Sequence, residues 1–276
     1  MVENEKRRKQ FEYERMLRDR ILNSNKNDRP KLYRLVYADL FSTFPDHSVF
    51  IPDEQRKRIG KLKAGMITPL LKTPSDVLEV GCGRGDVLAE LAWLGHRCTG
   101  IEPSVDMIEL CSKEVRIFDG CADKLEFPDS SFDLVFSQQV LEHLHPEDVP
   151  SHFAEAFRVL RSGGIFAVET PNRTTGPQDI SRGFTRVAQG LHLKEWSVGE
   201  LLREFQQAGF RQVKGLLAPP VLARRAALVY EISRVPGCIK WIQDALLKLV
   251  PGLAFRTICG KAIGLEDVFL FARKPF

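Results

Sequence analysis

Long apolar runs are missing from this sequence of 276 residues. No segment approaches the 18 or more apolar residues that a membrane-spanning helix needs, and the charged N-terminus lacks the apolar stretch of a signal peptide. The six cysteines form no Cys-x-x-Cys pair and no Cys/His cluster with zinc spacing. The sequence therefore predicts a cytoplasmic protein whose cysteines are reduced.

A strong charge imbalance is missing as well. The formal net charge is +4, which does not require a nucleic-acid partner, and none is expected. Much of the basic excess lies in residues 6–20, where apolar side chains alternate with charged ones. This pattern favours a solvated amphipathic helix, and contact with a polyanion or a peripheral membrane surface is the alternative.

A glycine-rich turn after a buried strand is the most informative motif that the chain does contain. Residues 77–80 are typical of a parallel strand, and the glycines at 81, 83 and 85 allow the backbone to turn tightly and approach a ligand. A dinucleotide fingerprint needs its third glycine at the sixth position, where this chain has Asp86. The motif predicts a nucleotide-type pocket without the usual pyrophosphate cradle.

The next predicted strand narrows the choice of ligand. It covers residues 97–101 and ends in Glu102, whose carboxylate can accept hydrogen bonds from both hydroxyls of a ribose. A solvated glutamate in a loop is the structural alternative. At this spacing after a glycine turn, we expect Glu102 to bind the ribose.

Strand and helix patterns alternate along the core, which predicts an α/β fold with a doubly wound, seven-stranded, mostly parallel sheet. Strands are expected at 76–80, 97–101, near 115–118, 132–136, 164–169, near 211–217 and 267–272. Helices are expected near 86–94, 104–112, 149–160 and 198–208, the last of which begins with the capping box Ser197-x-x-Glu200.

Five stretches in this order carry a family resemblance: residues 77–86, 100–104, 125–135, 140–143 and 159–166. Together they resemble the class I S-adenosylmethionine-dependent methyltransferases, in the small-molecule branch that includes ubiquinone-biosynthesis-type O-methyltransferases. The resemblance covers roughly residues 60–215. It implies a Rossmann-like methyltransferase sheet and S-adenosyl-L-methionine as the cofactor.

The two ends of the chain fall outside this resemblance. Residues 1–60 predict an N-terminal helical extension, with helices near 3–22 and 32–41, and residues 61–276 the methyltransferase domain. A helix at 59–71 is expected to lead from the extension into the core. The last two strands of such domains form a hairpin, but here residues 218–264 intervene, with helical patterns at 221–232 and 238–250. This helical insertion packs on the core, covers the acceptor pocket with Trp241 or rests on a membrane; the sequence leaves the three open.

The resemblance implies a set of cofactor contacts. Glu79, Gly81 and Gly83 would surround the methionine moiety, Glu102 would bind the ribose, and Gln138 would follow the fourth strand. Many relatives have an aspartate near residues 121–123 beside the adenine. Because this chain has Cys121 first, Asp123 or backbone groups would take that role.

The acceptor is expected at the loops after the fourth and fifth strands, where ligands of doubly wound sheets gather. A sulfonium methyl group is already activated, so alignment and exclusion of water are the main tasks and no metal is expected. His143 is the candidate general base, with a loop-orienting hydrogen bond as its structural alternative. Arg173, Arg182 and His192 are candidate acceptor contacts, and Glu142 is expected to be structural.

These features favour O-methylation of a small-molecule or glycan-type acceptor. N- or C-methylation of a small-molecule or lipid-like acceptor, and non-catalytic binding of S-adenosylmethionine, are the alternatives. The sequence does not predict an oligomeric state.

Overall fold

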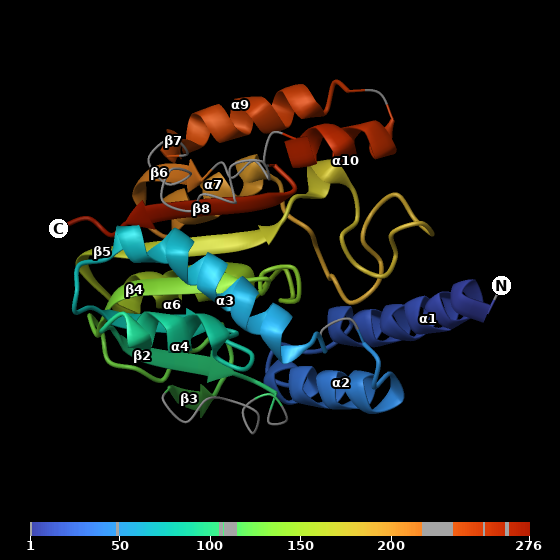
Figure 1. Cartoon of the computed structure of the whole chain (residues 1–276), viewed down its shortest axis with the longest axis horizontal. Coiled ribbons are helices and arrows are strands. Elements are labelled where there is room, and N and C mark those ends of the chain that lie inside the picture. The colour runs from blue at the N-terminus through green and yellow to red at the C-terminus, as the bar shows by residue number, and fades with distance from the viewer. Residues whose placement is uncertain are drawn as a thin grey trace.

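A computed structural model describes residues 2–47, 50–104, 107, 115–216, 234–250, 252–262 and 265–276 (Figure 1). Its strands form one sheet in the order β3-β2-β1-β4-β5-β8-β6-β7. The strands are β1 Asp76–Val80, β2 Arg97–Glu102, β3 Arg116–Asp119, β4 Phe132–Gln138, β5 Leu160–Pro171, β6 Arg211–Leu216, β7 Arg234–Pro236 and β8 Asp267–Arg273.

The sheet is parallel from β3 to β5 and antiparallel beyond it. β8 pairs with both β5 and β6 in antiparallel register. The seven expected strands are present, which confirms the predicted fold class. The three-residue β7 adds a short edge strand against β6, within the stretch expected to be an insertion.

Alternating side chains of the parallel strands build a core on each face. Val77 packs with helices α3 (Asp53–Ile67) and α4 (Asp86–Trp93), whereas the next residue, Leu78, packs with α6 (Val149–Val159) and α7 (Val198–Gln207). A strand buried on both faces reads as a continuous apolar run, which is why the core strands were recognisable. α7 begins with the predicted capping box of Ser197 and Glu200.

Two N-terminal helices, α1 (Val2–Leu22) and α2 (Arg29–Thr43), lie side by side beyond the ends to which the parallel strands point (Figure 1). Their shared apolar cluster includes Leu191 and Leu193, from the loop before α7. Both helices were expected, but their position over the sheet edge was not. The proposed domain boundary at residue 60 falls inside α3, which begins at Asp53, before the expected residue 59.

The described part of the insertion contains α9 (Gly237–Leu247) and α10 (Leu253–Ala262). Trp241 packs against Gly199 of α7, and Thr257 Oγ1 donates to the Thr175 carbonyl at 2.6 Å. The helix expected at 221–232, and most of the one at 104–112, lie outside the described residues. No helix of the described chain is long and apolar enough to cross a membrane.

Candidate active site

The glycine turn after β1 is shaped for close approach. Gly81 has φ +70°, and a Cβ there would lie 2.4 Å from Val140 Cγ2, so a side chain is excluded. Gly83 has φ +52°, and a Cβ there would enter open space. This open space belongs to two cavities that meet at the turn.

Glu102 lies at the end of β2 with its carboxylate held by two backbone donors. Gly83 N–H donates to Oε2 at 2.9 Å, and Ser104 N–H donates to Oε1 at 3.0 Å. Burial raises the pKa of Glu102, and these two hydrogen bonds oppose the rise. Each oxygen keeps a lone pair, so the carboxylate can still accept from two ribose hydroxyls.

Glu102 lines a cavity of about 210 Å³, which we call the nucleoside cavity. Its other walls come from the glycine turn, the start of the loop after β4, residues 120–122 and helix α2. Cys121 and Ala122 line the cavity, whereas Asp123 is not among its lining residues. The backbone alternative for the adenine site thus fits the cavity better than the side chain of Asp123.

On the other side of the glycine turn, Glu79 and Gln138 line the adjoining cavity. Glu79 Oε2 and Gln138 Nε2 are buried and have no hydrogen-bond partner within the described structure. An unpaired acceptor and an unpaired donor suit the ammonium and carboxylate groups of an amino-acid moiety. The residues present therefore fit S-adenosylmethionine, with its nucleoside at Glu102 and its methionine end at Glu79.

A second, larger cavity of about 700 Å³, the acceptor cavity, lies between the N-terminal helices and the loop before α7. Polar side chains contribute to its wall, namely Arg7, Gln10, Glu14, His47, Gln139, His143, Gln178, Asp179 and His192. It shares four lining residues with the nucleoside cavity, namely Tyr37, Phe41, Gln139 and His143. These four form the boundary across which the two cavities meet.

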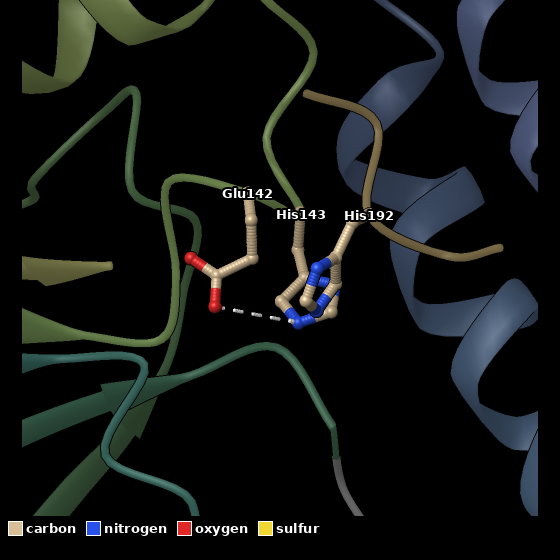
Figure 2. A group of neighbouring side chains, drawn as sticks. All are labelled: Glu142, His143 and His192. Atoms are coloured by element: carbon tan, nitrogen blue, oxygen red, sulfur yellow. Dashed lines mark ion pairs between the residues drawn. The ribbon is translucent and has the colours of Figure 1, made fainter. Parts of the chain in front are cut away.

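Glu142, His143 and His192 converge at this boundary (Figure 2). Glu142 Oε1 lies 4.0 Å from His143 Nε2, and one ligand-type atom from each of the three residues lies within 4.8 Å of the others. Glu142 is fully buried, and its Oε2 accepts a hydrogen bond from Thr170 Oγ1 at 2.8 Å. Its other oxygen has no hydrogen-bond partner among the residues described.

Burial also sets the protonation of this cluster. It raises the pKa of Glu142 to about 7 and lowers the pKa of His143 to about 3. For His192, burial lowers the pKa, but the hydrogen bond to Glu195 and the charge of Glu142 raise it by more. His143 is therefore a neutral imidazole near pH 7.

Two of the remaining candidate residues line neither the nucleoside nor the acceptor cavity. Arg173 pairs with Glu200 of α7 at 3.1 Å and lines neither the nucleoside nor the acceptor cavity. Arg182 lies 4.0 Å from Glu266 and is likewise absent from both walls. Among the acceptor candidates, only His192 faces the acceptor cavity.

Of the four residues on the wall shared by the two cavities, three were not predicted from the sequence: Tyr37, Phe41 and Gln139. Tyr37 and Phe41 stand four residues apart, so they share one face of α2, a spacing that could have marked them as a surface for packing. Gln139 has φ +52°, unusual for a residue other than glycine, and the amino-acid sequence alone gives no signal for it.

Comparison with known proteins agrees with this geometry. Residues 78–168 match the family described as methyltransferase domain. A probable S-adenosylmethionine-dependent methyltransferase of Mycolicibacterium smegmatis is 38% identical over 141 residues, which are 49% of this chain and 51% of that protein. The chain spans about half the length of the first curated relatives it matches.

Solved structures show the same fold. An S-adenosylmethionine-dependent methyltransferase from Archaeoglobus fulgidus matches with a TM-score of 0.57 at 20% identity, over 79% of this chain and 94% of its own. The 1,6-didemethyltoxoflavin-N1-methyltransferase of Burkholderia thailandensis matches with a TM-score of 0.54 at 22% identity, over 90% and 91%.

Residues 78–168 thus match a methyltransferase domain, the first curated relatives are probable S-adenosylmethionine-dependent methyltransferases, and the chain shares its fold with solved enzymes of that class. The predicted recognition, enzyme class and cofactor are confirmed. The individual site residues stay predictions.

Proposed function

We propose that this protein transfers the methyl group of S-adenosylmethionine to an oxygen atom of a small-molecule or glycan-type acceptor. The observation that carries the proposal is the wall shared by the nucleoside and acceptor cavities, at Tyr37, Phe41, Gln139 and His143. Bound S-adenosylmethionine supplies a methyl group already activated by its sulfonium sulfur. Residues on this wall can contact both reactants and hold them in line.

The chemistry of the acceptor cavity supports a hydroxylated acceptor. Carboxylate, carboxamide and imidazole groups of Glu14, Gln10, Gln178 and His192 line it. Such groups can donate to and accept from the hydroxyls of an acceptor. Because the described residues of α9 and α10 contribute nothing to either wall, this part of the insertion is better explained as packing than as the roof of the acceptor cavity.

His143 is the proposed catalytic residue, because it stands on the shared wall. Its Nδ1 lies 3.3 Å from the carbonyl of Leu191, which leaves Nε2 toward the cluster. The lowered pKa makes His143 a weak base, so deprotonation of an acceptor hydroxyl calls for an additional group.

The cytoplasmic location stays a prediction.

Methyl transfer from labelled S-adenosylmethionine tests the proposal, with panels of hydroxylated small molecules and glycans as acceptors. We expect an O-methylated product, and His143→Ala should lower turnover roughly 10²–10⁴-fold while S-adenosylhomocysteine binds nearly as before. His96→Gln is the control, because His96 is buried just before β2, at the amino end of the strand. Products methylated only on nitrogen or carbon would refute the proposed O-methylation. If the turnover of His143→Ala falls only a few-fold, His143 has a structural role.

A further inference from the structure

We propose that Glu142, His143 and His192 form a binding site for a divalent transition-metal ion, at the boundary between the nucleoside and acceptor cavities. Two imidazoles and one carboxylate are a ligand set that first-row metals such as zinc, iron, cobalt and manganese accept. No metal was expected from the sequence, in which His192 lies 49 positions beyond His143. Only the folded chain brings the three together (Figure 2).

The unpaired oxygen of Glu142 is the first observation that points to a ligand. Glu142 is fully buried, yet Oε1 has no hydrogen-bond partner in the described part of the chain. A buried carboxylate oxygen without a partner is unfavourable, and it lies toward His143 Nε2. A cation between these atoms would satisfy it.

The second observation is that both histidines are already oriented. His192 Nδ1 lies 2.9 Å from Glu195 Oε1, and His143 Nδ1 lies 3.3 Å from the Leu191 carbonyl. When each Nδ1–H donates to these oxygens, each Nε2 keeps its lone pair for a metal. A carboxylate or backbone carbonyl behind a ligating histidine is the usual supporting arrangement of metal sites.

The spacing of the three ligand atoms requires only small adjustments. They lie within 4.8 Å of one another, whereas ligands about 2.1 Å from a common metal lie roughly 3.0–3.5 Å apart. Rotations of the three side chains can close this gap without a movement of the backbone. Leu193 N–H donates to the Glu142 carbonyl at 2.6 Å, which holds the His192 loop against the loop after β4.

Three protein ligands leave coordination positions open toward the acceptor cavity, which His143 and His192 both line. This part of the inference rests on the proposed function. An acceptor hydroxyl bound to the metal would have a lowered pKa, so its proton can pass to solvent in the acceptor cavity. The oxygen then forms the new bond to the methyl carbon as the carbon–sulfur bond breaks, and S-adenosylhomocysteine leaves. The metal would thus activate the acceptor hydroxyl beside the cofactor.

Titration of the full-length protein with Co²⁺, without a polyhistidine tag, tests the site through the visible absorption of the bound ion. We expect one saturable site, and Glu142→Gln or His192→Asn should each weaken Co²⁺ binding by more than about 100-fold. Glu195→Gln, which alters the support of His192 and the acceptor of the Gln178 N–H but no metal ligand, should weaken it by roughly 10–100-fold. His96→Gln, a buried histidine outside the cluster, should leave Co²⁺ affinity unchanged.

Thermal unfolding and S-adenosylhomocysteine affinity show whether each variant is folded. Only variants that keep the wild-type unfolding temperature and S-adenosylhomocysteine affinity are used to judge the metal site. Absence of saturable Co²⁺ binding, or equal binding by wild type and by the folded ligand variants, would overturn the metal site. Co²⁺ bound at this site without O-methylation of any acceptor would instead refute the proposed function and leave the metal site standing.

Discussion

At the scale of single residues, the carboxylate of Glu102 is held in place before any ligand binds. The Gly83 and Ser104 N–H groups fix both of its oxygens, and the side chain is largely buried at the end of β2. A carboxylate fixed in this way loses little conformational entropy on binding a ribose. Its hydrogen bonds to the two hydroxyls are charge-assisted, which makes them stronger than neutral ones.

Replacing Glu102 with alanine should therefore weaken binding of S-adenosylhomocysteine by about 1.5–3 kcal/mol, measured by calorimetry. The control is Glu126→Ala, because Glu126 is exposed and forms a surface ion pair with Lys124 at 3.6 Å. We expect wild-type affinity for the control. An unchanged affinity of Glu102→Ala, or a preference of the wild type for NAD, would contradict the ribose assignment.

At the scale of elements, one buried ion pair ties α2 to the loop after β4. Arg29 contacts Asp148 at 2.7 Å and Glu147 at 2.6 Å, and both Arg29 and Asp148 are almost fully buried. The Tyr33 hydroxyl accepts a hydrogen bond from His145 N–H at 2.7 Å in the same contact. Because α2 carries Tyr37 and Phe41, this contact positions the aromatic wall of the nucleoside cavity.

Breaking the pair by Arg29→Ala should destabilise the protein by about 3–5 kcal/mol, since it leaves the Asp148 carboxylate buried without its cation. Urea denaturation measures this change in the free energy of unfolding. Arg8→Ala, which removes an exposed pair with Glu12, should change it by less than about 1 kcal/mol. If both variants have the same small effect, the Arg29 contact does not hold α2 in place.

At the scale of the whole molecule, the sequence predicted the sheet because its signals are local. The apolar runs of the core strands, the glycine turn and the Ser197 capping box each depend on neighbouring residues. The start of α3 was placed too late, although Pro52, Asp53 and Glu54 form a recognisable helix start. The glycine turn and Glu102, which we assign to the cofactor, follow core strands and could be proposed from the sequence for the same reason.

The acceptor end depends on contacts between distant segments, so the sequence could not place it. Trp196 Nε1–H donates to the Leu141 carbonyl at 3.2 Å, and this contact helps fold the loop before α7 back onto the loop after β4. That return brings His192 to His143 and leaves Arg173 outside. The N-terminal helices close the site through tertiary packing, which no local pattern encodes.

The pH dependence of stability tests the core itself, through His152 of α6. This side chain is fully buried, with Nδ1 at 3.0 Å from the Ala122 carbonyl and Nε2 at 3.2 Å from Ser137 Oγ. The neutral imidazole can donate to the carbonyl and accept from the hydroxyl. Burial lowers its pKa from 6.5 to about 4, because the charged form would lose its hydration.

The folded state therefore binds a proton at His152 more weakly than the unfolded chain does. Above pH 6.5 both states are neutral and the full stability is present; as the pH falls from 6.5 toward 4, the unfolded chain takes up the proton and stability is lost. The lowered pKa of this one group corresponds to a loss of about 3 kcal/mol across that range. His152→Gln keeps a donor and an acceptor but cannot titrate. Its deficit in unfolding free energy relative to wild type, measured in urea, should thus shrink between pH 7.5 and pH 4.5, and an equal deficit at both pH values would show that His152 does not carry this dependence.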